Sequence, residues 1–143
     1  MQIAEAIIVD ASVALKWVID EEGSDRASQL LDGRPLHTPA LLLTEAANAL
    51  WVIRRRGMID ASAAADALEH LRTAPFVLPP ADADLIGPAF RIAQLIDHPV
   101  YDCVYLALAI ERGAPVVTAD RRLISAAKQD PDVAMFVRSL SDI

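Results

Sequence analysis

Short apolar runs alternate with helix-like segments along the whole chain, and this alternation limits the possible folds more than any other feature of the sequence. The runs expected to form strands are residues 6–9, 36–38, 76–78, 115–118 and 135–137. The first run is β-branched, apolar and ended by a charged residue, as a buried strand is. Strands that alternate with helices indicate an α/β fold with a mainly parallel sheet. We therefore expect a three-layer α/β/α sandwich in which residues 1–143 form a single domain.

Capping and helix-breaking residues delimit the helices between these runs. Ser12, Ser24 and Thr38 are expected to cap three helices at their N-termini, while Gly57 and Gly113 are expected to end two helices. The expected helical segments are 12–19, 24–33, 38–56, 60–71, 83–97, 100–113 and 120–128. No repeat, low-complexity segment or linker interrupts this order.

Composition argues against several classes of protein. Hydrophobic residues make up 54% of the chain, yet no apolar run reaches the ~18 residues of a membrane-spanning helix. A secretion signal is not expected, because no basic segment precedes the first apolar run and Asp10 interrupts that run. A single cysteine cannot form an internal disulfide, which favours a reducing cytoplasm. The formal net charge of -7 argues against a protein that coats DNA through its overall charge.

Four acidic residues stand where parallel strands end and helices begin. Asp10 directly follows the first strand, Asp120 lies just past the fourth, and Glu45 and Asp102 lie near the starts of apolar helices. These positions share one side of a parallel sheet, so we expect the four carboxylates to converge. Crowded carboxylates repel one another unless a cation lies between them, and oxygen ligands suit Mg²⁺ or Mn²⁺. Zinc is not favoured, because the histidines and Cys103 show no ligand spacing.

Each acid also has an ordinary structural role open to it. Asp10 could be a turn residue at a strand end, and Glu45 could pair with an arginine. Asp102 could be an acid at the positive end of its helix. Asp120 could cap the helix that follows, which would not exclude metal binding.

Four blocks of the sequence resemble the PIN-domain ribonucleases, and specifically the VapC type of toxin from bacterial toxin–antitoxin pairs. They are VDASV with Lys16 and Trp17 at residues 9–17, Glu45 with NAL at residues 48–50, YDCVYLALA at residues 101–109, and VTADRRL at residues 117–123. The blocks occur in the family's order and cover essentially the whole chain. The last two are the more specific, since a lone aspartate after a strand is common.

The resemblance implies a PIN-like fold and a site in which Mg²⁺ or Mn²⁺ activates water to cut RNA endonucleolytically. Its metal ligands would be Asp10, Glu45, Asp102 and Asp120. Ser12 and Thr118 fall where the family often places hydroxyl groups of the cleft, although Ser12 by itself reads better as a helix cap. The implied partners are an RNA substrate and a cognate antitoxin, and the apolar composition suits a homodimer with a groove for that antitoxin.

Two other functions remain open on the residues alone. One is a metal-dependent phosphatase or phospho-accepting receiver domain, although residues 10–12 lack the second acid that aspartyl-phosphate phosphatases carry two positions on. The other is a catalytically silent module that acts only by binding a partner. The presence of all four acids argues against the silent module.

Overall fold

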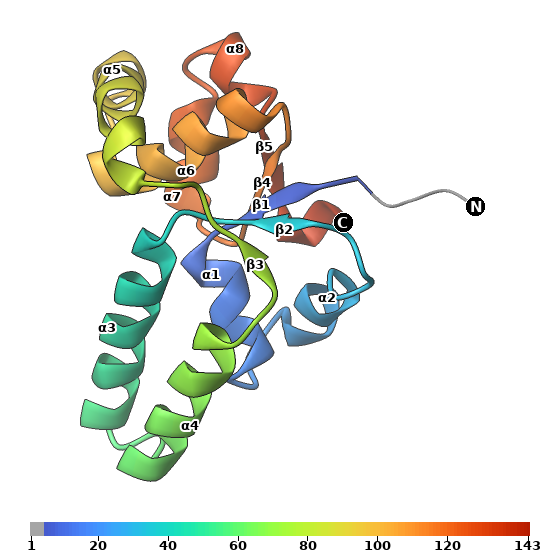
Figure 1. Cartoon of the computed structure of the whole chain (residues 1–143), viewed down its shortest axis with the longest axis vertical. Coiled ribbons are helices and arrows are strands. Elements are labelled where there is room, and N and C mark those ends of the chain that lie inside the picture. Colours follow the sequence, from blue (N-terminus) through green and yellow to red (C-terminus); the bar gives the residue numbers. More distant parts are fainter. Residues whose placement is uncertain (1–4) are drawn as a thin grey trace.

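Five short strands form one sheet at the centre of the computed structural model, which describes residues 5–143 (Figure 1). The strands are β1 (Ile7–Val9), β2 (Leu36–His37), β3 (Phe76–Val77), β4 (Val116–Thr118) and β5 (Val137–Ser139). Their order across the sheet is β3-β2-β1-β4-β5, and every neighbouring pair is parallel. The predicted parallel sheet is confirmed.

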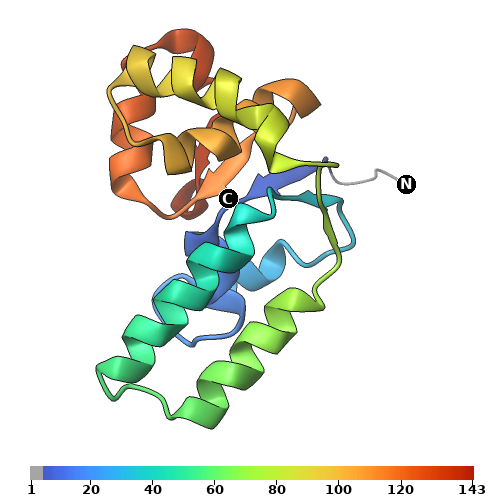
Figure 2. The ribbon, with the colours of Figure 1, turned by 60° about the vertical axis from the view of Figure 1, so that its left-hand side comes forward.

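Helices cover both faces of this sheet. They are α1 (Ala11–Ala14), α2 (Ser24–Gln29), α3 (Leu41–Arg55), α4 (Ala61–Arg72), α5 (Ile86–Ile96), α6 (Val100–Arg112), α7 (Arg121–Ala127) and α8 (Pro131–Ala134), with 3₁₀ turns at Leu15–Trp17, Asp82–Leu85 and Leu140–Asp142. Helices α1 to α4 lie on one side and α5 to α8 on the other, and α3 and α4 project together away from the sheet (Figures 1 and 2). The three-layer α/β/α arrangement is therefore confirmed.

The strand order reverses next to β1. The chain runs from β1 outward to β2 and β3, then crosses back to place β4 and β5 on the other side of β1. In open parallel sheets, the crevice beyond the carboxyl ends of the strands at such a reversal is where ligands bind. Asp10 and Thr118 lie at the carboxyl ends of the two strands that flank this reversal.

Helix α6 is the most buried helix beside the sheet. Every residue from Cys103 to Ala109 is buried, including Tyr105, which is 1% exposed. A helix that is apolar on nearly all sides packs inside a protein rather than on its surface, and α6 contacts α5, β1 and β4. Among residues 5–143, no helix is both long and apolar enough to cross a membrane.

Two predicted helix caps are wrong because other side chains take their place. Asp10, not Ser12, caps α1: its carboxylate accepts a hydrogen bond from the Val13 N–H, and Ser12 lies inside the first turn. The Thr38 hydroxyl donates to the Val9 carbonyl, so it ties β2 to β1. The start of α3 is instead capped from a distant segment, since the Asp82 carboxylate accepts from the N–H groups of residues 40 and 41.

Two further local predictions need correction. Gly23 occupies the N-cap position of α2, where its φ of 89° suits glycine, and Ser24 is the first helical residue. The last strand is Val137–Ser139 rather than residues 135–137. Helix α8, which was not predicted, precedes this strand and ends at Ala134. Met135, expected in the strand, caps that helix and is 70% exposed.

Candidate functional site

Asp10 is the most enclosed acid of the site. Asp10 is 6% exposed, and its Oδ1 accepts hydrogen bonds from the Ser12 hydroxyl at 2.6 Å and from the Val13 N–H at 3.1 Å. The Thr118 hydroxyl donates to its Oδ2. Burial raises the pKa of Asp10 from 3.8 to about 6, although these hydrogen bonds act in the opposite direction. Asp10 is therefore a buried acid whose carboxylate accepts hydrogen bonds from three donors.

The hydroxyl groups of Ser12 and Thr118 connect the two strand ends. Besides donating to Asp10, the Ser12 oxygen accepts from the Ala119 N–H at 2.9 Å, and the Thr118 oxygen accepts from the Asp120 N–H at 3.0 Å. The segment after β4 is thereby fixed to the turn after β1. The structure thus brings Ser12 and Thr118 together with Asp10, as expected for hydroxyls of one cleft.

Glu45 reaches the site from the second turn of α3. Its Oε1 accepts a hydrogen bond of 2.5 Å from the hydroxyl of Tyr105, a buried residue of α6. Burial is the largest cause of the raised pKa of Glu45, and the charge of Asp102 adds to it. The bond from Tyr105 lowers this pKa, because it favours the ionised carboxylate. No arginine pairs with Glu45 among the described residues.

Asp102 lies in the first turn of α6 and faces a histidine. The Nε2 atom of His98 lies 2.6 Å from Oδ2 of Asp102, with the two side chains 10% and 28% exposed. The negative charge of Asp102 raises the pKa of both Asp10 and Glu45. Because charge interactions weaken with distance, Asp10 and Glu45 each lie close enough to Asp102 to respond to its charge.

In the described chain, the side chain of Asp120 hydrogen-bonds only to the start of its own helix. Its Oδ1 accepts from the Arg122 N–H at 2.9 Å, so its side chain caps α7. Its charge is not among the causes of the raised pKa of Asp10 or Glu45. Its backbone nevertheless joins the site through Thr118. The capping role foreseen as an alternative is thus present, and ligation through the other oxygen stays a prediction.

The chemistry of these residues fits a divalent cation, although the side chains as placed do not form a closed ligand set. Among residues 5–143, no three His, Cys, Asp or Glu side chains are arranged to hold a metal ion. Glu45 and Asp102 each direct one oxygen at a neighbouring side chain. Asp10, Glu45 and Asp102 are nevertheless three oxygen donors whose charges oppose one another, and a hard cation between them would remove that repulsion.

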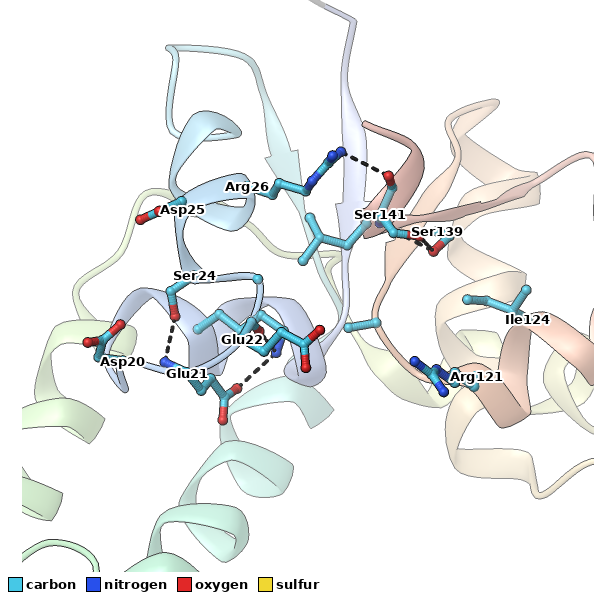
Figure 3. A pocket seen from close by; sticks show the side chains of 14 residues that line it. Asp20, Glu21, Glu22, Ser24, Asp25, Arg26, Arg121, Ile124, Ser139 and Ser141 are labelled. Atoms are coloured by element: carbon cyan, nitrogen blue, oxygen red, sulfur yellow. Dashed lines mark hydrogen bonds and ion pairs between the residues drawn. The ribbon is translucent and has the colours of Figure 1, made fainter.

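A charged hollow of about 700 Å³ lies beside the segment that carries Asp120, although none of the four acids lines it. It begins at Ala119 and Arg121, on either side of Asp120, and extends to the segment of residues 20–26 (Figure 3). Lys16 is paired there with Glu21 at 3.1 Å, and Arg26 donates to the carbonyls of Ser141 and Ile143. Arg121 lines the opposite side and makes no ion pair among the described residues.

Tyr105 and His98 were not foreseen as site residues. Neither residue was among the site residues expected from the sequence, and the histidines show no ligand spacing there. For Tyr105 the available signal was its place three residues after Asp102, because residues at this separation share one side of a helix. His98 lies before α6 begins, so helix periodicity gave no signal for it.

Most of the chain is similar in sequence to a known protein family. Residues 7–129 match the model of the PIN domain family. Ribonuclease VapC3 of Pyrobaculum aerophilum is 34% identical over 119 residues, which cover 82% of this chain and 91% of that protein. Ribonuclease VapC9 of Mycobacterium tuberculosis is 32% identical over 118 residues, with 82% and 87% covered.

Solved structures share the fold over a similar extent. PAE2754 of P. aerophilum has a TM-score of 0.66 at 25% identity, covering 96% of this chain and 93% of that one. VapC20 of M. tuberculosis, a toxin that cleaves the sarcin–ricin loop, has a TM-score of 0.65 at 20% identity, with 84% and 94% covered. VapBC2 of Rickettsia felis, bound to DNA from its promoter, has a TM-score of 0.60 at 8% identity, with 94% and 98% covered.

The order of the strands, the acids at their carboxyl ends, the family match and the curated relatives agree with one another. The chain belongs to the PIN domain family, among its VapC-type members.

Proposed function

We propose that this chain is a metal-dependent endoribonuclease and the toxin of a toxin–antitoxin pair. The observation that carries the proposal is the buried carboxylate of Asp10, held by three donors and subject to the charge of Asp102. A buried acid near a like charge is costly for stability, and such settings are concentrated at functional sites. The ribonuclease names of its VapC relatives supply the reaction class.

Asp10, Glu45 and Asp102 would hold Mg²⁺ or Mn²⁺, with Asp120 contributing through the oxygen that does not cap α7. When bound, the ion would supply an activated water and charge stabilisation at the phosphate. Ser12 and Thr118 orient Asp10, because each donates to a different one of its two carboxylate oxygens. Tyr105 orients Glu45. None of these residues needs to form a covalent bond to RNA.

The same proposal names the partners. Arg121, beside Asp120 on the wall of the charged hollow, is positioned to meet an RNA phosphate. A cognate antitoxin would hold the enzyme inactive, as befits a VapC-type chain, and a homodimer fits the exposed apolar residues Ile86, Phe90 and Tyr101. A chain with this function would act in the cytoplasm, as a single domain over residues 1–143.

The test is cleavage of a pool of small RNAs by the purified chain with Mg²⁺ or Mn²⁺, then with a chelator. Asp10→Asn and Asp102→Asn are compared with Asp84→Asn, which alters an exposed aspartate outside the four acids. Metal-dependent cuts that disappear only in the first two variants support the proposal. Cuts that persist in all variants indicate another nuclease. Metal binding without cleavage of any RNA would favour a phosphatase or a silent binding module.

A further inference from the structure

The corner between α5 and α6 contains an unusual backbone conformation. Asp97, which ends α5, has a φ of 52° and lies in the left-handed region. It is the one residue other than glycine with positive φ in the described part of the chain. Aspartate tolerates this conformation better than most residues, but at some cost. Such a conformation persists where the surrounding structure requires a sharp change of direction.

The residue after this turn, His98, has a firmly held backbone. Its N–H donates to the Ala93 carbonyl at 3.1 Å, the six-residue bond that closes many helix ends. Pro99 follows and restricts the backbone angles of His98. The side chain of Gln129, after α7, donates to the Ile96 carbonyl at 3.1 Å and braces the corner from another element. These contacts therefore fix the backbone of His98 and the direction in which its side chain leaves it.

The ring of His98 is directed at one atom of Asp102. Its Nε2 lies 2.6 Å from Oδ2, and its side chain is only 10% exposed. A ring nitrogen that faces a carboxylate at hydrogen-bond distance carries the proton, so Nε2 donates and Oδ2 accepts. Oδ1 of Asp102 has no hydrogen-bond partner within the described chain. The two oxygens of this carboxylate are thus distinguished by the histidine.

We propose that His98 is a positioning residue that fixes Oδ2 of Asp102 and thereby presents Oδ1 to the divalent cation. This inference rests on the proposed function, and it assigns a role to a residue outside the four acids. Side chains that orient a metal-binding carboxylate typically change metal affinity by about 10- to 100-fold when they are removed. The corner at residues 96–100 is the structural device that brings the ring to this position.

The test is the affinity of the full chain for Mn²⁺, measured by calorimetry without RNA. We compare wild type with His98→Ala, His98→Gln and His98→Asn. The glutamine amide reaches about as far as Nε2 of histidine, whereas the asparagine amide is too short. His70→Ala is the matched control, since His70 is an exposed histidine of α4 whose ring hydrogen-bonds in the described chain only to the Asp66 carbonyl of its own helix.

We expect His98→Ala and His98→Asn to weaken Mn²⁺ binding by about 10- to 100-fold and His98→Gln to stay within about threefold of wild type. His70→Ala should leave the affinity unchanged. Equal losses in the glutamine and asparagine variants, or no loss in either, would overturn the proposal. If His98→Ala does not fold, the glutamine and asparagine pair decides the result alone.

Failure of the proposed function would give a different pattern. Asp102→Asn is included for this purpose, because it removes the carboxylate that His98 orients. Wild type that binds no Mn²⁺, or that binds it no better than Asp102→Asn, would reject the metal site itself and with it the role of His98. A clear difference between wild type and Asp102→Asn, together with unaffected His98 variants, would reject His98 alone.

Discussion

The acids at the strand ends and the acids on the helices are held in different ways. Asp10 accepts hydrogen bonds from three donors, all within the segments that follow β1 and end β4. Glu45 and Asp102 each accept from one side chain, Tyr105 and His98 respectively. The sheet therefore fixes one part of the site, while single contacts from helices orient the other. A site of this kind has one rigid acid and two acids whose orientation depends on individual neighbours.

The largest effect should come from removing the rigid acid. Asp10→Asn should lower metal-dependent RNA cleavage by about 10³-fold or more, the scale of losing a group needed in the transition state. Single-turnover rates at saturating Mn²⁺ measure this loss. If Asp10→Asn lowers the cleavage rate no more than Tyr105→Phe does, the two parts of the site do not differ in importance.

The same acid should govern stability over a defined pH range. Because the pKa of Asp10 is raised from 3.8 to about 6, the folded chain binds its proton more tightly than the unfolded chain does. Its contribution to stability is therefore complete below pH 4, lost as the pH rises towards 6, and constant above that. The expected difference is about 3 kcal/mol. Denaturant unfolding in chelator should show a larger loss of stability between pH 4 and pH 6 in wild type than in Asp10→Asn, in which the raised pKa of Glu45 still acts.

Tyr105→Phe tests a helix-borne acid. It removes the hydroxyl that donates to Glu45 from a residue that is 1% exposed. The free energy of unfolding should fall by about 1.5–3 kcal/mol, the usual range for a hydrogen bond to a charged group. Tyr101→Phe is the control, because Tyr101 lies on the same helix and is 66% exposed. Equal effects of the two substitutions on chemical unfolding would contradict the importance of this contact.

Asp120 should give the smallest effect. Asn caps helices about as well as Asp does, so Asp120→Asn should leave stability nearly unchanged, whereas Asp120→Ala should cost about 1 kcal/mol. Because its Oδ1 already caps α7, we expect Asp120→Asn to weaken Mn²⁺ binding by less than about tenfold. Calorimetry decides this point. A loss as large as that of Asp10→Asn would make Asp120 a principal ligand.

The rigid part of the site is also the part that sequence reasoning located best. Asp10 and Thr118 are bounded by apolar runs whose strand character is visible, and parallel strands bring their carboxyl ends together. The Tyr105 contact depends on how α3 and α6 are rotated, and the His98 contact depends on the turn between α5 and α6. Both also depend on single side-chain torsions, which no apolar pattern reports. The prediction of the last strand was wrong because residues 135–137 are more apolar than Val137–Ser139, although β5 pairs with β4 through the latter.

The edge strand β3 has a consequence for how this protein can associate. It has only two residues, and Leu78, Pro79 and Pro80 follow it directly. Proline has no N–H to donate, and very short edge strands give an incoming strand little to pair with. Extension of the sheet across this edge, the first step towards edge-to-edge aggregation, is thereby blocked. Contacts with other chains on this side are left to helical surfaces, where side chains rather than backbone hydrogen bonds select the partner.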